Sequence, residues 1–105
     1  MAGEVRREMK KEYEEKIVSL MGSKNWKAAL YMFEQWQDKF TVPISKKFHI
    51  KIKILASLGR HGEAYDELLT IKKSMNFVDP DRLGFTKNEL ATRMKGIEKN
   101  LPSGL

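Results

Sequence analysis

Apolar residues recur at helical spacing in the first 40 residues, with one interruption. Residues 4–21 and 25–40 each carry an apolar face of the kind that a helix buries. The positions on these faces are Tyr13, Ile17 and Leu20 in the first segment and Trp26, Ala29, Leu30, Phe33, Trp36 and Phe40 in the second. Gly22-Ser23 separates the two segments, and Pro43 stops the second because proline disfavours helical geometry in the residue before it. Two helices are therefore predicted.

Residues 45–58 fit two patterns of burial. Every second residue from Phe48 to Ile54 is apolar, which on its own indicates a β-strand. The same segment also contains two helical stripes, as a helix buried on two sides would show. The stripes are Phe48, Ile52 and Leu55, and Ile50, Ile54 and Leu58. Because the neighbouring segments are helical and an isolated strand would have no partner to pair with, we predict a helix.

Two further helices are predicted in the rest of the chain. One follows the turn at residues 59–62 and runs to about Met75, and the other begins at Thr86, which makes a capping box with Glu89. Their apolar stripes are Ala64, Leu68, Ile71 and Met75, and Leu90, Met94, Ile97 and Leu101. Residues 76–84 are predicted to form a loop, because proline, glycine and two aspartates occur there.

The composition limits the classes of protein that these helices can form. A chain of 105 residues has room for one small domain, so residues 1–105 are expected to fold together. No apolar run approaches the roughly 20 residues that cross a bilayer, so no membrane association is expected. The chain has no cysteine, which excludes disulfides and thiolate metal sites. Its N-terminus shows no secretory or organellar presequence, so the cellular compartment stays open.

The second predicted helical hairpin repeats the pattern of the first. When the sequence is compared with itself at a shift of 35 residues, six apolar positions of the first hairpin coincide with apolar positions of the second. The pairs are Tyr13 with Phe48, Ile17 with Ile52, Leu20 with Leu55, Ala29 with Ala64, Phe33 with Leu68 and Trp36 with Ile71. A helical hairpin that recurs at this period is typical of an α-solenoid. The predicted fold is therefore all-α, with about five helices as antiparallel hairpins stacked in a short right-handed solenoid. Repeat one spans about residues 10–44 and repeat two about 45–81, and a capping helix spans about 86–101.

Two stretches carry a resemblance to a known family. SLMGSKNWKAALYMFEQW at residues 19–36 and FHIKIKILASLGRHGEAYDELLTIKK at residues 48–73 resemble pentatricopeptide repeats, and tetratricopeptide repeats share the length and the alanines. In the pentatricopeptide family the first helices of successive repeats line a groove for single-stranded RNA. The resemblance implies base-facing roles for Glu14 and His49, with Ile44 and Asp79 or Asp81 closing the units. It also implies a mitochondrial or plastid location.

Positive charge gathers in the middle of the chain. The formal net charge is +6, and residues 44–60 contain five basic residues and no acid. Among them, Lys46, Lys47, Lys51 and Lys53 are candidates to neutralise RNA phosphates, and a solvated helix face is the alternative interpretation. Among the aromatic residues of the second helix, Trp26 and Phe33 are expected in the core rather than as stacking platforms for bases, and Trp36 could take either role.

No motif for catalysis or for a metal site is present. His49 and His61 lie on different predicted elements without other ligands at metal-binding spacing, and no nucleophile pairs with a base. We therefore expect a binding protein rather than an enzyme, without cofactor or metal. The first hypothesis is binding of single-stranded RNA. The second is a protein-interaction adaptor, in which a partner or further repeats cover an exposed end, because about three repeats are needed for a stable stack.

Overall fold

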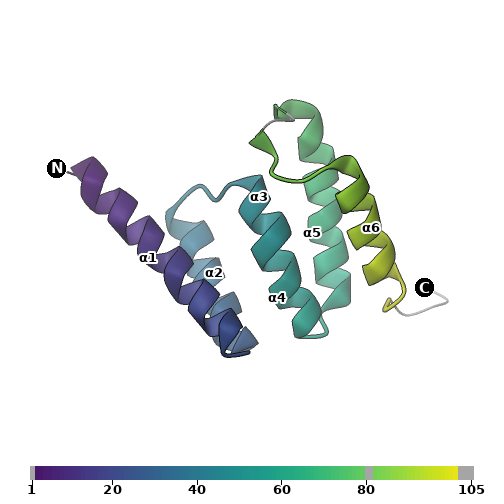
Figure 1. Ribbon diagram of the computed structural model, residues 1–105, viewed down its shortest axis with the longest axis horizontal. Coiled ribbons are helices and arrows are strands. Elements are labelled where there is room, and N and C mark those ends of the chain that lie inside the picture. Colours follow the sequence, from purple (N-terminus) through teal and green to yellow (C-terminus); the bar gives the residue numbers. More distant parts are fainter. Residues whose placement is uncertain (1, 80–81, 102–105) are drawn as a thin grey trace. The chain divides into compact units, whose positions relative to one another are not determined.

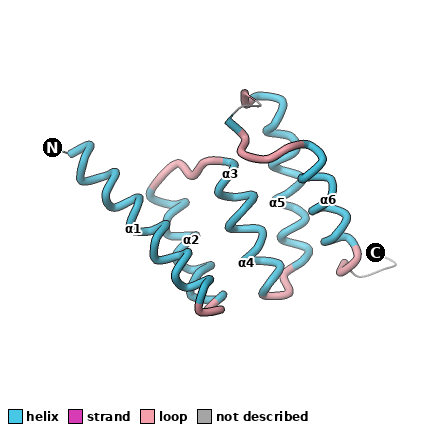
Figure 2. Tube along the Cα trace, in the orientation of Figure 1, coloured by secondary structure: helices cyan, strands magenta, loops and turns pink. Residues whose placement is uncertain are grey.

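The computed structural model describes residues 2–79 and 82–101, with side chains from Lys10 onward. Within these ranges all regular structure is helical and no residue lies in a strand, so the predicted all-α class is confirmed. The elements are α1 (Ala2–Gly22), α2 (Trp26–Lys39), α3 (Ile44–Lys46), the π-helical turn η1 (Lys47–Lys51), α4 (Ile52–Ser57), α5 (His61–Ser74), the 3-10 turn η2 (Met75–Phe77) and α6 (Lys87–Glu98), as Figures 1 and 2 show. The stacking of hairpins as a solenoid stays a prediction.

The chain divides into two compact units, Met1–Val42 and Pro43–Leu105. The first unit is the antiparallel hairpin of α1 and α2 (Figure 1), whose core consists of Ile17, Ala29, Leu30, Phe33 and Trp36. Asn25 occupies the N-cap position of α2, and its side chain makes no capping hydrogen bond. Lys39 Nζ donates to Tyr13 Oη at 2.8 Å, and this bond raises the pKa of Lys39 above its ordinary value.

The second unit begins with the segment whose pattern fitted both a strand and a helix. Elements α3, η1 and α4 form one continuous helix over residues 44–57, called here the α3–α4 helix. Both predicted stripes are buried except at Leu58, which is half-buried beyond the end of α4; the buried members are Phe48, Ile52 and Leu55 on one stripe and Ile50 and Ile54 on the other. The helix prediction is therefore confirmed, and the alternation arises because two faces of one helix are apolar.

The predicted loop after α5 folds back onto the first turns of the α3–α4 helix. Phe85 stacks on Phe48 with ring centroids 4.2 Å apart, and the Nε2 atom of His49 lies 2.9 Å from the carbonyl oxygen of Gly84. Gly84 has a φ of +73°, and a Cβ built there would lie 2.9 Å from the Cβ of Ser45. Leu83 and Phe85 are buried, so this loop belongs to the core of the second unit.

Helix α6 packs against α5 in the same unit. Leu90 and Ile97 of α6 are buried, and Tyr65 Oη of α5 donates to Glu98 Oε1 at 2.7 Å. The Thr86 hydroxyl accepts a hydrogen bond from the backbone N–H of Glu89 at 3.1 Å, which confirms the predicted cap. No helix among the described residues combines the length and the apolar character that a membrane span needs.

Candidate binding groove

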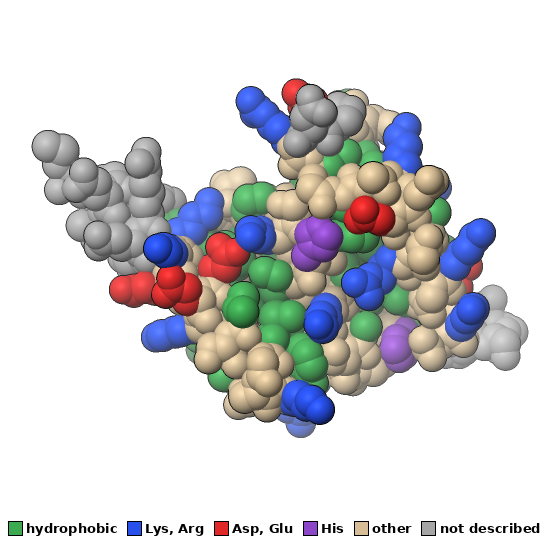
Figure 3. All heavy atoms as spheres, viewed as in Figure 1, with side chains coloured by type: hydrophobic (Ala, Val, Ile, Leu, Met, Phe, Trp, Pro, Cys, Tyr) green, Lys and Arg blue, Asp and Glu red, His purple; other side chains and the backbone are tan. Residues whose placement is uncertain are grey.

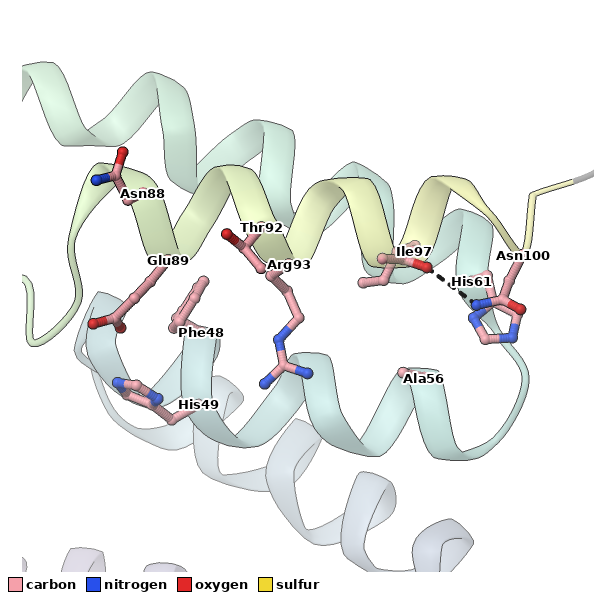
Figure 4. Close-up of a pocket in the computed structure, with 11 residues that line it drawn as sticks. Phe48, His49, Ala56, His61, Asn88, Glu89, Thr92, Arg93, Ile97 and Asn100 are labelled. Carbon is pink, nitrogen blue, oxygen red and sulfur yellow. Dashed lines mark hydrogen bonds between the residues drawn. The ribbon is translucent and has the colours of Figure 1, made fainter.

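A groove of about 670 Å³ lies in the second unit between the α3–α4 helix and α6 (Figure 4). The α3–α4 helix contributes one wall, α6 contributes the opposite wall, and the start of α5 lies at one end. The lining residues are Phe48, His49, Ala56, His61, Asn88, Glu89, Thr92, Arg93, Gly96, Ile97 and Asn100. Ligand-binding pockets commonly enclose about 300–1,000 Å³, so the groove is large enough for a ligand.

The wall from α6 and the turn that follows it consists of two adjacent rows of residues. One row is Asn88, Thr92, Gly96 and Asn100, and the other is Glu89, Arg93 and Ile97. Members of each row are four positions apart and therefore share one face of the helix. The side chains in these rows are mostly polar and exposed, whereas the buried face of α6 carries Leu90. The amphipathic pattern of α6 thus directs a hydrogen-bonding surface toward the groove.

The middle of the groove is open because small residues occupy both walls there. A Cβ built on Gly96 would meet no atom within 4 Å, and Ala56 contributes only a methyl group from the facing helix. Arg93 extends from α6 across the groove between Phe48 and Ala56 (Figure 4). The open space therefore lies beside a cationic, planar side chain.

The two histidines lie near opposite ends of the groove. His49 lies beside Glu89 at one end, and His61 lies beside Asn100 at the other (Figure 4). Both histidine rings are visible on one face of the second unit in Figure 3. The Nδ1 atom of His61 is buried and has no hydrogen-bond partner in the structure. A buried nitrogen of this kind is unusual, because burial without a partner costs about 1–3 kcal/mol.

The predicted lysine cluster does not line this groove. Lys51 turns toward α5, where its Nζ lies 2.5 Å from Glu67 Oε1, and only 15% of its side chain is exposed. Lys46 and Lys47 are half-buried, and Lys53 is exposed. The run of positive charge in the sequence is therefore divided among different sides of one helix.

The other predicted site residues are spread over the chain. Of the seven candidates, His49 alone lines the groove. Glu14 is a half-buried residue of α1 in the first unit, and Asp81 lies outside the described residues. Sequence reasoning missed Arg93, Gly96 and Asn100, although their spacing at three and four positions marks one helix face. It assigned His61 to a turn, and His61 is the first residue of α5.

Two polar contacts of the second unit involve residues that do not line the groove. The Arg60 guanidinium is hydrogen-bonded to Glu63 in the first turn of α5, and this contact lowers the pKa of the Glu63 carboxyl. The bond from Tyr65 to Glu98 raises the pKa of the Tyr65 hydroxyl, since the protonated phenol is the donor. No group of three or more potential metal ligands gathers among residues 10–79 and 82–101.

Comparison of the chain with protein-family models, with curated proteins and with solved structures finds no match. The resemblance to pentatricopeptide repeats therefore stays a prediction from the sequence.

Proposed function

We propose that this chain is a helical binding protein for single-stranded RNA, and not an enzyme, with the strand in the groove between the α3–α4 helix and α6. The groove itself is the observation that supports the proposal. It combines hydrogen-bonding side chains on α6, the guanidinium of Arg93 and an open centre at Gly96. Proteins recognise single-stranded RNA through polar contacts to exposed base edges and through planar side chains that stack on bases.

The charge of the chain suits a polyanionic ligand. The formal net charge is +6, and Lys46, Lys47 and Lys53 lie on the helix that forms one wall of the groove. Lysines near the strand attract phosphates, and this contribution to affinity falls as salt displaces the released counterions. Lys51 is excluded from this role because Glu67 already neutralises it.

Base reading by Glu14, His49 and Asp81 is not part of the proposal. Glu14 belongs to the first unit, and the Nε2 atom of His49 is already hydrogen-bonded with the carbonyl of Gly84. We therefore propose binding with little dependence on base sequence. Arg93 and the polar rows of α6 are its main determinants.

A titration with a short fluorescent single-stranded RNA tests the proposal, with duplex DNA as the comparison ligand. We expect the wild-type chain to bind the RNA more tightly than the duplex. Arg93→Gln is expected to weaken RNA binding about tenfold, the size of a lost charged contact. Arg82→Gln is the matched control, since Arg82 is exposed and lies outside the groove. Absence of RNA binding at low salt, or equal effects of the two variants, would contradict the proposal.

A second candidate function is a protein-interaction adaptor, and one exposed aromatic residue favours it. Phe77, in the turn after α5, is 90% exposed, although phenylalanine is usually buried. Exposed aromatic side chains often anchor protein interfaces. If the chain is an adaptor, a pull-down would supply its partner protein. Phe77→Ser is then expected to abolish association with that partner and to leave RNA binding unchanged. Arg93→Gln would then have no effect on that association.

A further inference from the structure

The centre of the groove, called here the slot, is an open space between two small residues. Gly96 in α6 and Ala56 in the α3–α4 helix face the same space, and neither has a side chain long enough to fill it. Glycine within a helix lowers stability by about 0.5–1 kcal/mol relative to alanine. At Gly96 the added Cβ of alanine would contact nothing, so packing does not require glycine there.

One side of this slot is formed by a group that stacks on flat rings. The Arg93 guanidinium extends into the groove between Phe48 and Ala56 (Figure 4). A guanidinium is planar and weakly hydrated, and it stacks on aromatic faces more readily than a lysine ammonium does. The flat ligand part that best matches such a group is an aromatic ring with hydrogen-bonding edges.

The far end of the slot offers hydrogen bonds to such edges. The Asn100 side chain donates from Nδ2 to the carbonyl oxygen of Gly96 at 3.2 Å, and its amide also carries an oxygen that accepts. His61 lies next to it with its buried Nδ1 atom unpartnered. A ring that presents both donors and acceptors at its edge can pair with the Asn100 amide, which offers one of each.

We propose that this slot holds one unstacked nucleobase of the bound RNA, with Arg93 over its face and with Asn100 and His61 at its edge. This inference rests on the proposed function and adds the part of the RNA that enters the groove. The site extends from the centre of the groove to the end opposite His49, the residue to which the sequence resemblance assigned base contact. A base in a duplex is held by stacking and pairing that cost a few kcal/mol to break, so the slot favours single strands.

The test compares two ligands and two leucine variants. The ligands are a short single-stranded RNA and a strand with the same sugar-phosphate backbone that lacks bases. Gly96→Leu fills the slot, whereas Gly62→Leu is the matched control, because Gly62 is a helical glycine of the same unit with open space and lies outside the groove. Circular dichroism and thermal melting establish that both variants are folded.

We expect Gly96→Leu to weaken RNA binding about tenfold and Gly62→Leu to leave it unchanged, as expected for loss of one stacked base. The wild-type chain should bind the base-free strand as weakly as the Gly96→Leu variant binds the RNA. Equal affinity of the wild-type chain for the two ligands would overturn the inference, and this measurement needs no variant.

The outcomes distinguish a failure of this inference from a failure of the proposed function on which it rests. If RNA binding is lost in Arg93→Gln but retained in Gly96→Leu, the groove binds RNA without an inserted base. The inference then fails and the proposed function stands. If the wild-type chain binds no RNA at low salt, both fail.

Discussion

Gly59 and Gly84 both adopt positive φ angles but differ in what surrounds them. A Cβ on Gly59 would meet no atom within 4 Å, whereas a Cβ on Gly84 would lie 2.9 Å from Ser45 Cβ. Gly84→Ala is therefore expected to combine the strain of left-handed backbone with a steric clash, at a cost of about 2–4 kcal/mol. Gly59→Ala should cost about 1–2 kcal/mol from the backbone alone. Urea unfolding of the two variants measures the difference, and equal losses would show that the loop does not press on Ser45.

Substitution of Gly96 is expected to act in the opposite direction. Gly96→Ala should stabilise the fold by about 0.5–1 kcal/mol, because alanine is the better helix former and its Cβ has open space. Urea unfolding at neutral pH measures this change. A loss of stability would mean that the groove closes around Gly96 in solution.

At the scale of the elements, an ion pair joins the α3–α4 helix to α5. Lys51 and Glu67 are both mostly buried, with side-chain exposures of 15% and 25%. Lys51→Glu would place two carboxylates together and is expected to cost about 1–3 kcal/mol. The double variant Lys51→Glu, Glu67→Lys restores the opposite charges, so thermal melting should show recovery of most of the loss. Absence of such recovery would show that the charges of Lys51 and Glu67 do not interact.

A hydrogen bond between α5 and α6 makes their association sensitive to alkaline pH. The bond to Glu98 raises the pKa of Tyr65 above its ordinary value of 10.0, because the phenol donates only while it is protonated. Its contribution to stability is present below about pH 10 and is lost as the pH rises through the raised pKa. The melting temperatures measured at pH 8 and above about pH 11 should therefore differ less for Tyr65→Phe than for the wild-type chain.

The boundaries of the helices could be predicted from the sequence because their causes are local. The apolar stripes, Pro43 and the Thr86 cap depend on neighbouring residues, and the structure bears them out. The stacking of Phe85 on Phe48 could not be predicted, since it joins distant parts of the chain. For the same reason, the lysine run looked like one surface. Only the packing of α5 reveals that Lys51 is paired with Glu67.

For the molecule as a whole, the positions of the positive charges determine how salt should affect RNA binding. Replacement of Lys46, Lys47 and Lys53 with glutamine removes three charges from the wall helix. The slope of log K against log salt concentration should become shallower by up to about 2, at roughly 0.7 per phosphate contact with a single strand. Titrations at several salt concentrations measure this slope. An unchanged slope would place the phosphates elsewhere.

The division of the chain into Met1–Val42 and Pro43–Leu105 falls close to the predicted border between repeats at residues 44 and 45. The candidate groove lies entirely within the second of these units. The groove's components, α6 and the α3–α4 helix, come from the predicted capping helix and the predicted second repeat. Arrangement of the two units as a solenoid remains a prediction, and the proposed binding site does not depend on it.

The π-helical turn η1 also bears on how the chain tolerates changes in length. At this turn the N–H of Ile52 bonds to the carbonyl of Lys47, so the helix accommodates one residue more than regular α-helical bonding would. Loss of one residue from η1 would leave an ordinary α-helix, with Ser45 still under Gly84 and Ala56 still facing α6. Loss of a residue from the middle of α5 would instead rotate everything beyond it by about 100°. Length variants of this protein should therefore be tolerated at η1 before they are tolerated in the other helices.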